Sequence, residues 1–227
     1  MSLSWHSNLG PAAIQELCTD LDTAGPDRKA RAEFALQNVA LSVTKQGAER
    51  ERLQYVSALA GALERHPSDR AASFILAQLQ LTGRGESIAP ASRFLNDPHL
   101  CEPAAQAMVA IREGADAAFL SALPRAEKEC RITIIQSLGV LRSSRAVDAL
   151  RDESASEDSG IRRAALEALE NIEAPRAGSD SLSAAARGRA TPAGAGNPAG
   201  PGAGAPAPDR ALGPESADSI LAIAETA

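Results

Sequence analysis

Four helix-like segments of the chain end at regular intervals, and this repeat constrains the fold more than any other feature of the sequence. The segments end at Leu81, Ile111, Leu141 and Ile172, with spacings of 30, 30 and 31 residues. Within each segment, apolar residues recur three and four positions apart, which places them on one face of a helix. The sequence therefore predicts a series of similar amphipathic α helices.

Alignment of the four segments places residues of similar size in columns. Three columns hold mostly large apolar side chains, and a fourth holds small ones. The columns are Leu81/Ile111/Leu141/Ile172, Gln78/Met108/Leu138/Leu169, Ile75/Ala105/Ile135/Leu166 and Ala77/Ala107/Ser137/Ala168. Such columns are typical of repeats in which each copy packs against the next.

A shorter apolar segment precedes each of the last three helices, so the unit is a pair of helices in about thirty residues. The shorter segments are 88–95, 117–123 and 146–152. Asp97 and Asp158 lie just before second helices, where a carboxylate can accept free backbone N–H groups. Pro103 falls in a first helical turn, where its missing N–H costs nothing. Because one pair cannot bury its apolar face alone, the sequence predicts an all-α, right-handed α-solenoid.

The chain divides into four predicted regions. Longer helices are expected at 12–24, 27–45 (with Asp27 as its cap), 48–66 and 68–83, so residues 1–83 would cap the solenoid. Residues 84–173 would form three short repeats. Residues 174–215 consist largely of Ala, Gly and Pro, which predicts a disordered linker. Residues 216–227 regain helical spacing, and this short helix would dock on the solenoid, contact a partner or begin a further domain.

Composition excludes several classes of function. Only 3% of the residues are aromatic, against 44% hydrophobic, which disfavours an aromatic-lined ligand pocket or a base-stacking platform. The net charge of −6 opposes nucleic-acid binding. Cys18, Cys101 and Cys130 are widely spaced and predict free, buried thiols rather than a metal or redox site. Since no signal peptide or membrane-spanning run is evident, a cytoplasmic location is expected.

Residues 158–172, DSGIRRAALEALENI, resemble the second helix of a HEAT repeat of the short, bacterial, phycobilisome-lyase-like type. The resemblance is carried by Asp158, Ile161, Arg162, Ala165, Ala168, Leu169 and Ile172. Residues 130–150 resemble a junction between two such repeats, through Arg131, Leu138, Gly139, Ala146, Val147 and Leu150. The copy at 86–111 departs from the pattern, with Cys101-Glu102 where Arg is usual. The resemblance covers roughly 84–172 and implies an α-solenoid.

We expect no enzyme, cofactor or metal site, because the chain lacks a recognisable catalytic constellation. His6, His66 and His99 lie in different predicted elements, and GRGES at 83–87 is interpreted as a turn between helices. The leading hypothesis is a non-catalytic scaffold for protein–protein interaction. The resemblance also implies a bilin or chromophore lyase-like protein, which the low aromatic content opposes. A HEAT-like nucleic-acid-binding module is the least favoured alternative.

A partner is expected on the inner surface that the second helices line. The candidate residues fall in two aligned polar columns and at two helix ends. Gln106, Gln136 and Glu167 share one column (with Leu76 in the earliest copy), Arg131 and Arg162 share another, and Arg112 and Arg142 follow helix ends. They would form a groove with Gln and Arg donors for another protein, a peptide segment or the chain's own C-terminal helix. Alternatively they are solubilising residues, and Arg131 or Arg162 bonds a neighbouring turn.

Overall fold

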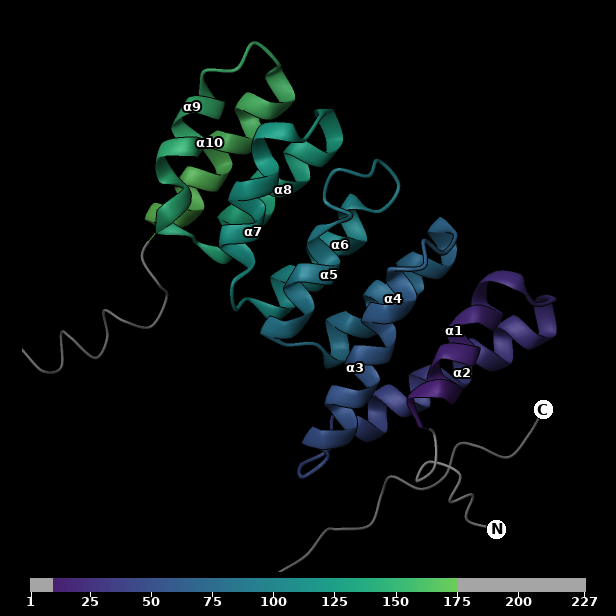
Figure 1. The fold of residues 1–227 in the computed structure, drawn as a ribbon. Helices are drawn as coiled ribbons and strands as arrows, with labels where there is room; N and C mark the ends of the chain where they lie inside the picture. Colours follow the sequence, from purple (N-terminus) through teal and green to yellow (C-terminus); the bar gives the residue numbers. More distant parts are fainter. Residues whose placement is uncertain (1–9, 175–227) are drawn as a thin grey trace, which may run out of the picture. The chain divides into compact units, whose positions relative to one another are not determined.

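The computed structural model describes residues 10–174, and no strand occurs among them (Figure 1). This part of the chain consists of α helices and short 3-10 turns, which confirms the predicted all-helical class. Apart from Ala174, the predicted linker at 174–215 and the predicted helix at 216–227 lie outside the described residues, as does His6.

The N-terminal helices start and stop at the proline and glycine signals of the sequence. They are α1 (Pro11–Thr23), α2 (Pro26–Val43), α3 (Glu49–Leu63) and α4 (Asp69–Thr82). Pro11 and Pro26 each occupy the first turn of a helix. Backbone N–H groups in that turn have no acceptor within the helix, so the missing N–H of proline costs nothing. Asp27 is therefore not the cap of α2, as predicted, but lies inside its first turn. Gly25 takes the cap position instead.

The C-terminal half contains three helix pairs, each with a short first helix and a longer second one. These are α5 (Ile88–Ser92) with α6 (Cys101–Ile111), α7 (Ala115–Ala122) with α8 (Lys128–Leu141), and α9 (Val147–Ser154) with α10 (Ser159–Glu173). Short 3-10 turns adjoin the first helices, at η2 (Gly85–Ser87), η3 (Leu123–Arg125) and η4 (Ser144–Ala146). The predicted unit of two helices per repeat is thus present.

The two acidic residues predicted to cap second helices behave differently. The Asp158 carboxylate accepts the N–H groups of Gly160 and Ile161 at 2.7 and 3.1 Å, and so caps α10 as predicted. Asp97 does not cap α6, which begins four residues later. Its carboxylate accepts the His99 N–H instead, within the turn that precedes the helix.

The helices form two layers, which Figure 1 shows as a succession of pairs from α1 to α10. In one layer α2, α4, α6, α8 and α10 pack in order, each on the next. In the other, α1 packs on α3 and α5 on α7, while α7 contacts η4 at the start of α9. The described N-terminal helices therefore continue the same two layers, and α4, α6 and α8 each lie between the preceding and the following helix of their layer.

The core runs between the layers and contains mostly aliphatic side chains. Its largest fully buried members are Tyr55 and Phe119. The three cysteines are free and buried, as predicted. Burial raises the pKa of the Cys18 thiol to about 11 and that of Cys130 to about 12, so both thiols are protonated at neutral pH. No helix among residues 10–174 is both long enough and apolar enough to cross a membrane.

The alignment of α4 with α6 needs a correction of one residue. Leu81, the predicted partner of Ile111, is 53% exposed, whereas Thr82 is 2% exposed. The buried positions of the two helices match at an offset of 29, with Ala77 rather than Leu76 opposite Gln106. The aliphatic Leu81 suggested the wrong register because a threonine fills the buried position. Its hydroxyl is satisfied by donating to the Gln78 carbonyl at 2.8 Å.

Helices α8 and α10 approach each other closely at one glycine. A Cβ atom added to Gly139 would lie 2.7 Å from the Cα and 2.8 Å from the Cβ of Ala168. A backbone atom cannot move aside as a flexible side chain can, so only glycine fits here. Gly139 and Ala168 thus set the distance between α8 and α10.

Candidate partner-binding surface

The second-helix surface, as we call it, comprises the solvent-facing side chains of α6, α8 and α10. Gln106, Gln136 and Glu167 are all exposed and occupy equivalent positions on three consecutive helices. The row does not include Leu76, which is fully buried, because at the corrected offset of 29 the residue of α4 at this position is the exposed Ala77. The structure thus places three of the predicted residues at equivalent, solvent-facing positions.

Glu102 joins two of these helices and was not predicted. Its carboxylate accepts the Gln106 side-chain amide at 2.9 Å within α6, and the Thr133 hydroxyl of α8 at 3.2 Å. The first contact uses the Gln106 amide nitrogen as its donor, and the Gln106 residue is exposed. The i,i+4 spacing of Glu102 and Gln106 was the available signal for this pair.

Aliphatic side chains lie beside the polar row. Val140 is 55% exposed and stands one helical turn after Gln136, while exposed Ala110 stands one turn after Gln106. In α10 the Glu167 carboxylate lies 3.8 Å from the Arg163 guanidinium, so that end of the row carries a negative and a positive charge. The second-helix surface therefore combines amide and carboxylate groups with exposed aliphatic side chains.

Arg131 does not belong to this surface. Its guanidinium makes two hydrogen bonds to the Glu153 carboxylate, at 2.9 and 2.6 Å, and a weaker one to the Ala126 carbonyl. Glu153 lies near the end of α9 and is buried, so this ion pair connects one helix pair to the next. The hydrogen bond from Arg131 to Glu153 raises the pKa of the arginine, which therefore stays charged. In the structure, Arg131 stabilises the contact between α8 and α9.

Arg162 is exposed and bonds a neighbouring turn. One nitrogen, Nη1, donates to the carbonyl groups of Ser156 and Glu157, at 2.7 and 3.4 Å. These residues precede the helix that carries Arg162, so the contact closes the turn between α9 and α10. Arg131 and Arg162 thus both make the contacts with neighbouring segments that were weighed as the alternative to partner binding.

Arg112 and Arg142 both have a positive φ angle, although only Arg142 adopts the left-handed helical conformation. Each caps the C-terminus of a second helix with a positive φ, of 67° and 54° respectively. This region of φ favours glycine, because a Cβ atom crowds the backbone there. Both arginines, thirty residues apart, therefore have a strained backbone. Residues with a strained backbone are often found at functional sites, so the two side chains are candidates for a function. Arg112 is exposed and Arg142 is half-buried.

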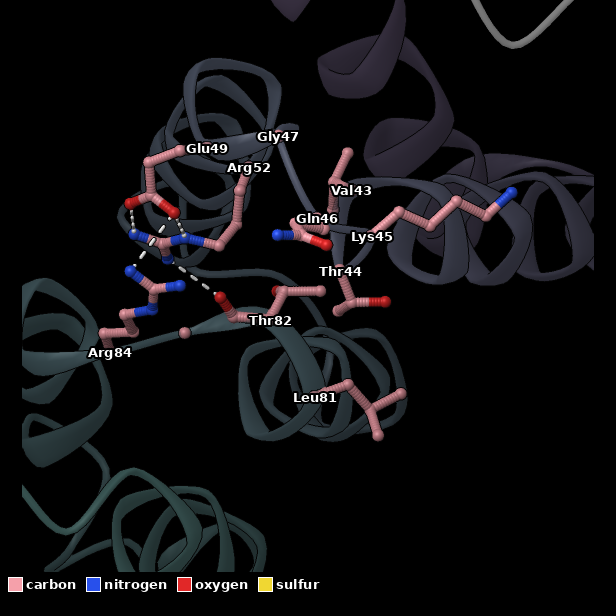
Figure 2. A pocket seen from close by; sticks show the side chains of 11 residues that line it. Val43, Thr44, Lys45, Gln46, Gly47, Glu49, Arg52, Leu81, Thr82 and Arg84 are labelled. Atoms are coloured by element: carbon pink, nitrogen blue, oxygen red, sulfur yellow. Dashed lines mark hydrogen bonds and ion pairs between the residues drawn. The ribbon is translucent and has the colours of Figure 1, made fainter.

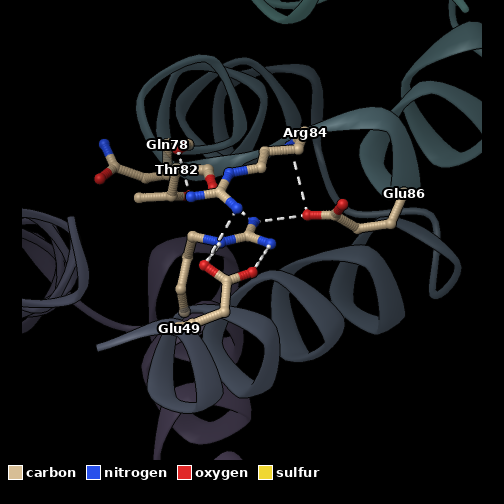
Figure 3. A network of polar contacts seen from close by, with 6 residues as sticks. Glu49, Gln78, Thr82, Arg84 and Glu86 are labelled. Carbon is tan, nitrogen blue, oxygen red and sulfur yellow. Dashed lines mark hydrogen bonds and ion pairs between the residues drawn. The ribbon is translucent and has the colours of Figure 1, made fainter. Parts of the chain in front are cut away.

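The most prominent polar cluster lies elsewhere and was missed by the sequence analysis. Arg52 of α3 is only 4% exposed, and each of its guanidinium nitrogens donates a hydrogen bond. Its partners are the Glu49 carboxylate, the Glu86 carboxylate and the Thr82 carbonyl at the end of α4 (Figure 3). Arg84 adds a contact to Glu49 at 3.1 Å. The hydrogen bond from Arg52 lowers the pKa of Glu49 and so keeps it ionised.

This cluster borders a cleft of about 340 Å³ between α3 and the ends of α2 and α4 (Figure 2). Lys45, Gln46 and Leu81 also line it. Because the donors of Arg52 are already paired, the arginine serves to fix the GRGES segment rather than to bind a ligand. Among the described residues no group of three or more His, Cys, Asp or Glu side chains is placed to hold a metal ion.

A comparison with known families bears on the same part of the chain. A family model described as HEAT repeats matches residues 117–188, about a third of the chain. Within the described range the match begins inside α7 and includes α8, α9 and α10. No curated protein and no solved structure matches the chain significantly. Together with the paired helices, the family match shows that this part of the chain is similar to HEAT repeats.

Proposed function

We propose that this protein is a non-catalytic scaffold that binds an extended segment of another protein on its second-helix surface. The observation that carries the proposal is the row of Gln106, Gln136 and Glu167, exposed at the same position of three consecutive helices. The amides of Gln106 and Gln136 both donate and accept hydrogen bonds and the Glu167 carboxylate accepts them, so the periodic row suits the periodic backbone of a peptide. HEAT repeats commonly serve as protein-interaction scaffolds, which agrees with this role.

The proposal includes a right-handed solenoid and a role for the arginines at the ends of two second helices. A right-handed solenoid would place the second helices on the inner side, where adjacent rows converge on a bound chain. Arg112 and Arg142 would contribute cations at the ends of two helices. Their strained backbone supports a functional reason for the arginines, because glycine would be the more stable choice at both positions.

The test is site-specific photocrosslinking in cells that make the protein. A crosslinking residue at Gln136 is expected to capture a discrete partner, which the same probe at Asp148 does not capture. Asp148 is a suitable control because its side chain is 96% exposed and lies on α9, in the other layer. Replacing Gln106 and Gln136 by Ala together should abolish copurification of that partner with the helical content unchanged.

Two outcomes would contradict the proposal. Equal capture from Gln136 and Asp148 would mean that the second-helix surface is not special. Capture that persists after both glutamines are replaced would mean that the row contributes nothing. Repeating the experiment with residues 175–227 removed separates capture of an outside partner from capture of the chain's own C-terminal segment.

A further inference from the structure

The outer face of α10 is built like an internal face but is not covered by any element among residues 10–174. In α8, Ile135 and Leu138 are fully buried, and this helix packs on α10, while Arg131 on the same helix contacts Glu153 of α9. The equivalent residues of α10, at a spacing of 31, are Leu166 and Leu169. Leu166 is 49% exposed and Leu169 is half-buried. The predicted columns are correct here, but the last copy has no described neighbour.

Four residues define what we call the α10 strip: Arg162, Leu166, Leu169 and Glu173. Their spacing of i, i+4, i+7 and i+11 places them along one face of the helix. The strip thus has an apolar centre, with a cation at one end and an anion at the other. Arg162 and Glu173 are exposed.

The repeat before α10 shows which group an arginine at the first position of such a strip can contact. Arg131 corresponds to Arg162, and its Nε and Nη2 hold a carboxylate of the next helix pair, that of Glu153. In Arg162 only Nη1 has partners among the described residues, the carbonyl groups of the preceding turn. The same two nitrogens therefore remain available to a carboxylate from whatever covers the strip.

We propose that the α10 strip is covered by the same strip of a second copy of this chain, in an antiparallel and two-fold symmetric dimer. The strip is symmetric about the point between Glu167 and Ala168. When two copies cross there, each Arg162 faces the partner's Glu173, and each Leu166 faces the partner's Leu169. A two-fold interface requires this kind of self-complementary surface.

The charges determine the orientation as well as the partner. A parallel pair of strips would place arginine beside arginine and glutamate beside glutamate, at a cost in free energy. The antiparallel pair places opposite charges together at both ends and encloses four leucines between them. Since one helix per subunit buries a small area, the dimer is weak and concentration-dependent.

The experiment is sedimentation velocity of the full chain over a range of concentrations, together with charge-reversed variants. The unchanged chain should show a monomer–dimer equilibrium. Arg162→Glu and Glu173→Arg should each weaken dimerisation at least about tenfold, since each places like charges together twice. Arg50→Glu is the control, because it makes the same charge change at an exposed position of α3 and should leave the dimer unchanged.

Mixing the two single variants gives the sharpest result. Neither variant should dimerise well alone, yet their mixture should form a heterodimer. One strip then carries a carboxylate at each end and the other strip carries a guanidinium at each end, so opposite charges meet at both ends. The double variant Arg162→Glu/Glu173→Arg should likewise recover the dimer. A full chain that stays monomeric at every concentration, whether or not removal of residues 216–227 makes it dimerise, would overturn the proposal. So would single variants that weaken the dimer but fail to associate when mixed.

Discussion

The first and the last helix pairs of the described stack are stabilised by different kinds of contact. In α1 to α4, long-range polar contacts join the helices: Tyr55 donates its hydroxyl to the Leu36 carbonyl at 2.9 Å, and Arg52 ties α3 to the end of α4 and to Glu86. In α8 and α10, a glycine lets two helices approach until backbone and side chain touch. The most buried polar cluster thus lies in the N-terminal region, whereas the C-terminal region combines close packing of small residues with the Arg131–Glu153 ion pair.

The largest expected effect is the removal of the arginine that organises the first region. Arg52→Ala removes hydrogen bonds to two carboxylates and to a carbonyl, and should lower the free energy of unfolding by about 3 kcal/mol. This loss lies near the lower end of the range expected for breaking a buried ion pair, because the Glu49 and Glu86 side chains are partly exposed. Urea unfolding measures it. Arg50→Ala on the same helix is the control, and an equal loss in both variants would contradict a special role for Arg52.

The next effect tests close packing in the second region. Gly139→Ala should lower the free energy of unfolding by about 2 kcal/mol, because the added methyl overlaps the Ala168 backbone. The matched control is Gly61→Ala in α3, whose new Cβ would have its nearest neighbour at 3.7 Å. That variant should gain up to about 1 kcal/mol from helix propensity. If both variants shift thermal unfolding in the same direction, packing does not distinguish the regions.

Arg142 offers a smaller effect of the opposite sign. Arg142→Gly should raise the free energy of unfolding by about 1 kcal/mol, since glycine adopts the left-handed conformation without strain. Arg142→Ala keeps the strain and should bring no gain. If the arginine serves a partner, the glycine variant will be more stable but will bind less well. A glycine variant no more stable than the alanine variant would show that the backbone is not strained.

The smallest effect concerns the cap of the last helix. The N–H groups of Ile161 and Gly160 lower the pKa of Asp158 below its usual value of 3.8. The ionised cap therefore stabilises the fold above about pH 4, and this contribution is lost as the pH falls through the lowered pKa. Urea unfolding of wild type and Asp158→Asn at about pH 6 and about pH 3 should show a difference that shrinks in acid. A difference independent of pH would contradict an ionised cap.

The regular region was largely predictable because its helices repeat the same contacts with their neighbours. The helix pairs, the Asp158 cap and the exposed row of Gln106, Gln136 and Glu167 all follow from spacing. The error at Leu81 arose where a buried threonine replaced an aliphatic residue. Leu166 was assigned correctly to its column, yet it is exposed because burial depends on a neighbour that the column does not specify.

The polar contacts could not be predicted in the same way. Arg52 and Glu86 are 34 positions apart, and nothing in their local sequence distinguishes them from other surface charges. Arg131 and Arg162 share a column, but one reaches a carboxylate of the next pair and the other the turn before its own helix. The partner of an arginine side chain depends on how neighbouring elements pack. The columns therefore specify the position of the arginine in its helix but not the group that it contacts.

The central claim is that each helix pair is held by its immediate neighbours. The most direct test is hydrogen exchange measured by mass spectrometry on the wild type, Arg52→Ala and Gly139→Ala. Faster exchange should be confined to α3, α4 and η2 in the first variant, and to α8, α9 and α10 in the second. Exchange that rises uniformly over residues 10–174 in either variant would contradict the claim, because the stack would then unfold as one unit.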